Sequence, residues 1–138
     1  MLQYNYWEQL TYEIDENFPE LISHSPYPQN YYNLSLEKHL AHVSLVINTV
    51  KKRLTTQLWI DDDKELFDFL YEYKNDIEDE IGFELTWERL DNKKASCIDI
   101  YKNFDVKKNK NWDEAIKWHL EMACKFQNAF NDKLKQYE

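Results

Sequence analysis

The sequence is poor in the residues that build tight, flexible loops. It contains one glycine, Gly82, and three prolines among 138 residues. Phosphate-binding loops and nucleophile elbows need several glycines at fixed spacings, because these turns require backbone conformations and close approaches that other residues resist. The sequence therefore argues against nucleotide-binding enzymes and hydrolases of those classes.

Cysteine and long apolar runs are also scarce. Cys97 and Cys124 each lie within an apolar pattern and outside any CxxC spacing, so we expect two reduced packing residues. No stretch approaches the roughly 18 consecutive apolar residues typical of a membrane span, and the first residues lack the basic and apolar regions of a signal peptide. We therefore expect a cytoplasmic protein without a membrane segment.

Basic charge is scarce in the middle of the chain. The net charge is −9, and residues 61–91 carry thirteen acidic and only three basic side chains. Such a segment repels the phosphates of nucleic acid. We interpret it as a solvated acidic helix face, with the alternative that it imitates DNA phosphates and occupies the groove of a DNA-binding protein.

Three segments have the apolar periodicity of helices, and their starts carry capping signals. Each begins with Asn or Asp and has Glu three residues later, as in a capping box. The expected N-caps are Asn5, Asp62 and Asn111, and the expected helices are Tyr6–Phe18, Lys64–Ile81 and Trp112–Leu134. Gly82 would then end the second helix in a left-handed conformation.

Five segments between these helices alternate between apolar and polar residues, as strands do. They are Tyr31–Leu36, His42–Asn48, Arg53–Ile60, Phe83–Glu88 and 96–100. Short connections favour antiparallel pairing. The predicted fold is α+β, one domain over residues 1–138, with three helices against a five-stranded antiparallel sheet in the order α-β-β-β-α-β-β-α.

The same alternation identifies the residues on the other face of the sheet. They are mainly polar, with two aromatic rings among them. The candidate binding face consists of His42, Arg53, Gln57, Trp59, Asp99 and Tyr101. An ordinary solvated sheet face has a similar composition, so this alternative stays open.

Two further sets of side chains could form binding surfaces. The candidate basic tips are Lys51, Lys52, Lys93 and Lys94. With Lys107, Lys108 and Lys110 they make three lysine-rich connections, which could contact phosphates if two of them share one end of the sheet. The candidate partner stripe is Phe67, Tyr71, Trp118 and Met122, which lie beside the apolar stripes of the second and third helices. A wide apolar arc indicates either deep burial or a partner surface.

We find no constellation of catalytic, cofactor-binding or metal-binding residues. His39 and His42 straddle the start of a strand, where a spacing of three does not place both on one face, and Asp61, Asp62 and Asp63 lack the glycine of a calcium loop. His24 and His119 have no neighbouring nucleophile. We therefore expect a protein without enzymatic activity and without a cofactor.

Laid end to end, several of these segments resemble a known family. They are Leu58-Trp59-Ile60, Glu78-Asp79-Glu80-Ile81-Gly82-Phe83-Glu84-Leu85-Thr86-Trp87, Ser96-Cys97-Ile98 and Trp112 to Phe130. Together they resemble the prokaryotic domain-of-unknown-function family 4268, from about Trp7 to Leu134. That family often follows a nuclease-like domain of the restriction-endonuclease type, which implies a link to DNA transactions or defence. These 138 residues contain no such nuclease domain, and the resemblance supplies no catalytic residues.

These patterns favour a non-enzymatic interaction module. The wide apolar arcs of the second and third helices suggest that it binds a protein partner or forms a homodimer. A nucleic-acid accessory module linked to restriction or defence nucleases is an alternative based on the basic tips. An acidic inhibitor that imitates DNA is another, based on residues 61–91.

Overall fold

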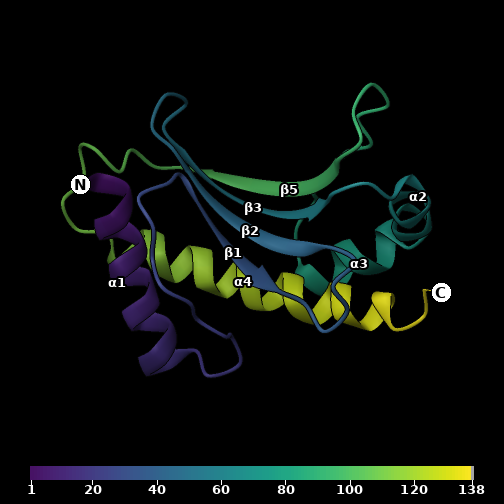
Figure 1. Cartoon of the computed structure of the whole chain (residues 1–138), viewed down its shortest axis with the longest axis horizontal. Coiled ribbons are helices and arrows are strands. Elements are labelled where there is room, and N and C mark those ends of the chain that lie inside the picture. The colour runs from purple at the N-terminus through teal and green to yellow at the C-terminus, as the bar shows by residue number, and fades with distance from the viewer. Residues whose placement is uncertain (138) are drawn as a thin grey trace.

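A computed structural model describes residues 1–137 of the chain (Figure 1). This part of the chain contains four helices and five strands. In chain order they are α1 (Leu2–Asn17), β1 (Tyr31–Ser35), β2 (His42–Asn48), β3 (Arg53–Ile60), α2 (Lys64–Glu72), α3 (Lys74–Ile81), β4 (Thr86–Glu88), β5 (Ser96–Asn103) and α4 (Asp113–Leu134). The α+β class is confirmed, as is the sheet of five strands.

All strand pairs are antiparallel, and the strands lie in the order β1-β2-β3-β5-β4. The strand predicted from residue 83 begins only at Thr86, because Gly82 ends α3 with a backbone φ of 92° and the chain must turn before it can pair with β5. β5 continues past the expected residue 100 to Asn103, paired along its whole length with β3. β4 is thus a short edge strand.

The helices cover one face of the sheet, with α4 running beneath the strands (Figure 1). β3 alternates strictly between half-buried and buried residues, and the buried positions face the helices. Leu54, Leu58 and Ile60 on β3 are fully buried, together with Trp7 of α1 and Phe126 of α4. Alternation with period two therefore separates an apolar face under the helices from a polar face on the opposite side.

The predicted count of three helices is wrong, since the expected helix Lys64–Ile81 is divided at Tyr73 into α2 and α3. The Tyr73 N–H donates to the carbonyl of Leu70, three residues back. This bond tightens the turn and changes the direction of the helix axis between α2 and α3. Each half then buries its own apolar residues, Leu70 in α2 and Ile77 in α3. The observed order is α-β-β-β-α-α-β-β-α.

None of the helices described over residues 1–137 is long and apolar enough to cross a membrane.

The predicted helix starts also need correction. α1 begins at Leu2, so Asn5 lies inside the helix, and α2 is capped by Asp63, whose carboxylate accepts from the Leu66 N–H at 3.0 Å. Asn111 lies one residue before the Trp112 cap, although its side chain still accepts from the Asp113 N–H at 2.9 Å. A capping pattern identifies the helix start to within a few residues only, because neighbouring polar side chains compete for the same amides.

Candidate binding face

The outer face of the sheet is concave, with the β2–β3 turn rising at one end and the β4–β5 hairpin at the other (Figure 1). Its hollow encloses a volume of about 790 Å³. Side chains from all five strands and the adjoining turns line it: Asn30, Tyr31, Asn33, His42, Ser44, Val46, Asn48, Lys51, Arg53, Thr55, Gln57, Trp59, Asp61, Thr86, Glu88, Asp99 and Tyr101. We call this hollow the outer cavity.

All six residues of the candidate binding face line the outer cavity. The structure adds others that we had not identified, above all Asn33, Asp61 and Glu88. Asn33 and Glu88 occupy outward positions of β1 and β4, so the alternation that gave the other residues could have found them. Asp61 directly follows the last residue of β3, where the alternation ends.

Antiparallel pairing places the outward residues in rows across the sheet, and each row has its own chemistry. One row joins His42, Trp59, Cys97 and Glu88. The next joins Ser44, Gln57, Asp99 and Thr86. The row at the opposite end joins Asn48, Arg53 and Asn103. The acidic side chains therefore gather at the end near the β4–β5 hairpin, and Arg53 lies at the end near the β2–β3 turn.

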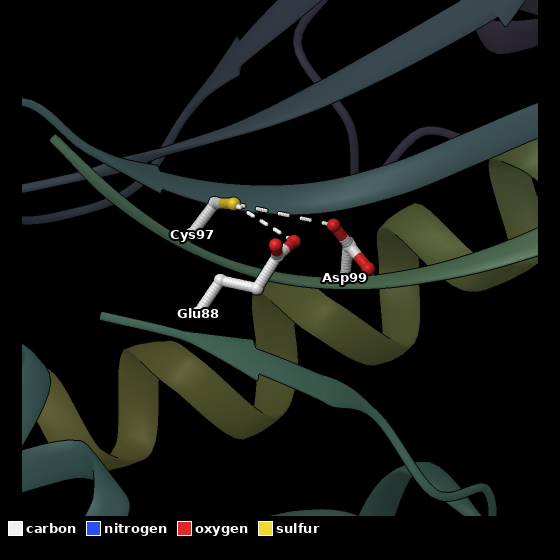
Figure 2. Close-up of side chains that lie close together, drawn as sticks. All are labelled: Glu88, Cys97 and Asp99. Atoms are coloured by element: carbon white, nitrogen blue, oxygen red, sulfur yellow. Dashed lines mark hydrogen bonds between the residues drawn. The ribbon is translucent and has the colours of Figure 1, made fainter. Parts of the chain in front are cut away.

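At the acidic end, Glu88, Cys97 and Asp99 point toward one another (Figure 2). The Cys97 Sγ lies 3.7 Å from Glu88 Oε1 and 4.0 Å from Asp99 Oδ2. Burial, helped by the negative charge of Glu88, raises the pKa of Asp99 to about 6. Burial and both carboxylates raise the pKa of the Cys97 thiol to about 12. The group therefore retains its protons more strongly than isolated side chains would.

The ligand atoms of these three side chains lie within 4.8 Å of one another, close enough to surround a cation. A thiol must lose its proton to bind a metal well. The high pKa of Cys97 opposes that loss, so the arrangement favours a hydrogen-bonding role for the thiol. Glu88 and Asp99 are the stronger candidates for contact with a positively charged ligand.

His42 and Trp59 form the remaining part of the acidic end. The Trp59 Nε1 donates to Asp61 Oδ1 at 2.8 Å, which fixes the indole at the edge of the outer cavity. Burial lowers the pKa of His42, and the nearby Asp61 partly opposes this shift. At neutral pH this histidine is therefore mainly uncharged.

At the basic end, the Arg53 guanidinium lies 4.2 Å from the centre of the Tyr101 ring, a cation–π arrangement. The adjoining turn is held by Asn48, whose Oδ1 accepts from the backbone N–H groups of Val50 at 3.1 Å and Lys51 at 2.8 Å. The turn therefore keeps Lys51 at the rim of the outer cavity.

The candidate basic tips do not share one end of the sheet. Lys51 and Lys52 lie beside Arg53, whereas Lys93 and Lys94 lie in the β4–β5 connection at the opposite end (Figure 1). The segment after β5, which holds Lys107 and two further lysines, returns to the first end, where the Phe104 N–H donates to the Lys52 carbonyl at 2.9 Å. Of the three lysine-rich connections, the two that come together are therefore the β2–β3 turn and the segment after β5.

The β4–β5 hairpin at the acidic end is held by Lys64, a half-buried lysine that the sequence patterns did not single out. The Lys64 ammonium donates to the carbonyls of Leu90 at 3.0 Å and Ala95 at 2.8 Å, to Ser96 Oγ at 2.9 Å, and to the Arg89 carbonyl. We call this set of contacts the Lys64 anchor. It ties the β4–β5 connection to the first turn of α2.

Two further contacts hold the same hairpin. Arg89 forms two hydrogen bonds with the Asp68 carboxylate of α2, at 2.9 and 3.1 Å. Glu78 of α3 accepts from the backbone N–H of Leu85 at 2.8 Å and from Trp87 Nε1 at 3.0 Å. The strand that carries Glu88 is therefore positioned by both halves of the divided helix.

His119 lies beneath the sheet and is fully buried. Its Nδ1 lies 2.8 Å from the Tyr6 hydroxyl and its Nε2 lies 3.1 Å from the Thr55 carbonyl. A carbonyl only accepts, so Nε2 carries the proton and Tyr6 donates to Nδ1. Burial lowers the pKa of His119 to about 4, as expected for a neutral core histidine.

The candidate partner stripe does not form one exposed surface. Phe67 and Met122 are each 4% exposed and belong to the core, and Trp118 packs half-buried against it. Tyr71 is 51% exposed and contacts Phe67 and Trp87. Of the two interpretations of the wide apolar arcs, burial describes most of these residues.

Comparison with known proteins adds a family and little else. No curated protein matches the chain, and no solved structure matches it. One family model does, described as a domain of unknown function (DUF4268), and it matches residues 2–134. Because the match covers nearly all of the chain and agrees with the resemblance found in the sequence, the protein belongs to the DUF4268 family.

Proposed function

We propose that this chain is a non-catalytic binding module that receives a segment of a partner protein on its outer sheet face. The observation that supports this most is the gathering of polar and aromatic side chains from five strands around one cavity of about 790 Å³. That volume falls within the usual range for ligand sites. A half-buried carboxyl such as Asp99, with its raised pKa, is also more common in functional sites than on ordinary surfaces.

The dimensions of the outer cavity suit an extended peptide. From Cys97 to Asn103, β5 rises about 20 Å at the usual 3.3 Å per residue. A ligand strand of about six residues has the same length. The carboxylates of Asp61, Glu88 and Asp99 along one end would repel the phosphates of a nucleic acid, whereas a protein segment can supply groups of either charge.

A random dodecapeptide library displayed on phage tests the proposal. Gln57 lines the outer cavity from β3, the central strand of the sheet, so Gln57→Trp should obstruct the cavity. Peptides enriched on the wild-type domain should lose binding to this variant. They should bind normally to Tyr12→Ala, a control on the exposed side of α1, where Tyr12 is 66% exposed. Thermal melts check that both variants fold.

The proposal is wrong if no peptide is enriched above an unrelated control protein, or if enriched peptides bind Gln57→Trp as well as the wild type. Self-association is a further outcome to measure, by light scattering over a concentration series. A dimer that Gln57→Trp dissociates would identify a second copy of this chain as the occupant of the outer cavity.

A nucleic-acid accessory role has one observation in its favour. Lys51 and Lys52 lie at the same end of the sheet as the lysine-rich segment after β5, so two basic connections come together there. Gel-shift assays at low salt test this role. Binding that is absent, or unchanged by Lys51→Glu combined with Lys52→Glu, would reject it.

A further inference from the structure

The two ends of the outer cavity carry opposite charge. Glu88 and Asp99 lie at the end near the β4–β5 hairpin, and Arg53 and Lys51 lie at the end near the β2–β3 turn. Asp99 pairs with Gln57, and Arg53 lies four residues from Gln57 along β3. At about 3.3 Å per residue, roughly 13 Å of strand separates the two charged ends.

Within residues 1–137 no salt bridge neutralises Glu88 or Asp99, and the positive charges of Lys93 and Arg53 act on this end only from beyond salt-bridge distance. The salt bridges found among residues 1–137 lie elsewhere and join Arg89 to Asp68 and Asp91, Lys102 to Glu114, and Lys135 to Glu37. Each carboxylate of the Glu88–Asp99 pair opposes the ionisation of the other across a gap of less than 4.8 Å. In the free protein, a proton is the simplest way to relieve this repulsion.

The basic end likewise carries a charge that no salt bridge within residues 1–137 neutralises, so it can receive an anion. Arg53 is absent from those salt bridges and lies over the Tyr101 ring, which orients its guanidinium without neutralising it. Lys51 lines the cavity beside it. A planar guanidinium held in this way is suited to a carboxylate, which it can bind through two parallel hydrogen bonds.

On the basis of the proposed function, we infer that the bound segment carries a lysine or arginine side chain that lies between Glu88 and Asp99, and a carboxylate that reaches Arg53. Trp59, whose indole is fixed by Asp61, forms an aromatic wall next to the basic side chain. In an extended segment, residues four apart point to the same side and lie about 13 Å apart. The ligand therefore has its basic and acidic residues about four positions apart.

This arrangement also fixes how binding depends on pH. The groups facing Asp99 are Glu88, Cys97 and Arg53, with His42 and Asp61 further along the same end. The pKa of Asp99 is about 6, so the carboxyl is mainly protonated at pH 5 and mainly ionised at pH 7.5. A cationic ligand prefers the ionised form. Affinity should therefore rise up to about tenfold between pH 5 and pH 7.5.

The test uses peptides enriched on the phage library and then synthesised. Each basic residue is replaced in turn by its neutral isostere, norleucine for lysine and citrulline for arginine, and affinity is measured by fluorescence anisotropy. We expect at least a tenfold loss at one position. Asp99→Asn and Glu88→Gln should weaken binding of the parent peptide to a similar extent. The loss from the neutral peptide and the loss from the protein variant should not add when the two are combined.

Glu84→Gln is the matched control, because Glu84 is an exposed acid that lies two residues before β4 and outside the outer cavity. It should change affinity less than twofold. Asp99→Asn should also abolish the rise of affinity between pH 5 and pH 7.5, which separates Asp99 from His42, whose protonation at low pH acts in the same direction.

Several outcomes would overturn the inference. One such outcome is that peptides lose binding to Gln57→Trp but bind equally well with neutral isosteres and to Asp99→Asn. That outcome would support the binding module and reject the inferred basic side chain of the ligand. A flat pH profile with the wild-type domain would do the same. If no peptide is enriched, the proposed function and this inference fail together. If Asp99→Asn does not fold, the affinities of the neutral peptides for the wild-type protein still test the inference.

Discussion

The two faces of β3 differ completely although their residues alternate along one strand. Toward the helices, Leu58 is fully buried among apolar side chains. Its neighbour Gln57 lies half-buried in the outer cavity, next to a carboxyl group with a raised pKa. The helix-covered face is arranged for stability, with His119 neutral and hydrogen-bonded at both ring nitrogens, while the outer face retains charges that the fold does not require.

From this comparison we expect the largest difference in the free energy of unfolding between substitutions at the neighbouring positions Leu58 and Gln57. Leu58→Ala should lower the free energy of unfolding by about 2 to 5 kcal/mol, because it leaves a cavity in the core. Gln57→Ala should change it by less than about 0.5 kcal/mol. Urea denaturation measures both. Similar losses for the two variants would show that the outer face also supports the fold.

His119 should make the helix-covered face sensitive to acid. Its pKa is about 4 in the folded protein and about 6.5 when unfolded, so folding favours the neutral ring. The contribution is complete above pH 6.5 and is lost as the pH falls to 4, by roughly 3 kcal/mol in total. Comparing the wild type with His119→Gln by urea denaturation at pH 7.5, 5.5 and 4.5 isolates this term. Parallel pH profiles would contradict it.

The Lys64 anchor should contribute less, and it supports the wall of the outer cavity. Lys64→Met keeps the aliphatic stem but leaves the carbonyls of Leu90 and Ala95 without their charged donor. We expect a loss of about 1 to 3 kcal/mol in the free energy of unfolding. Lys94→Met, an exposed lysine of the same hairpin, is the control and should be neutral. Equal effects would mean that the anchor adds nothing.

The smallest expected effect has the opposite sign. Because burial raises the pKa of Asp99 to about 6, the ionised carboxyl disfavours folding, and this penalty grows as the pH rises from about 4 through 6. Asp99→Asn should therefore raise the melting temperature slightly at pH 7.5 and have no such effect at pH 4. A lower melting temperature at pH 7.5 would indicate that the charge stabilises the fold.

Alternation and helical periodicity could predict the two faces because each depends only on local spacing. They placed Gln57, Asp99 and Tyr101 on the same face before any register was known, and Gly82 at a helix end, where its N–H donates to the Glu78 carbonyl at 2.8 Å. These features require no knowledge of distant contacts.

Other features depend on contacts between distant segments, so local patterns could not reveal them. Tyr73 is an ordinary helix residue by spacing, yet the helix divides there, and its ring lies against α4 with the Lys133 ammonium 4.5 Å from the ring centre. The approach of Glu88 to Asp99 depends on the register between β4 and β5. The cavity itself depends on the curvature of the sheet, which no single strand encodes.

The Lys64 anchor also has a consequence for motion. One ammonium holds both sides of the β4–β5 connection to the start of α2, through Leu90 on one side and Ala95 on the other. Local opening of this region must therefore break these bonds together, so its backbone amides should exchange with solvent deuterium as one cooperative unit. The β2–β3 turn, held by its own Asn48 and by one bond from the Phe104 N–H to the Lys52 carbonyl, should exchange independently of α2 and faster. One wall of the outer cavity would then open only together with α2, while the other moves on its own.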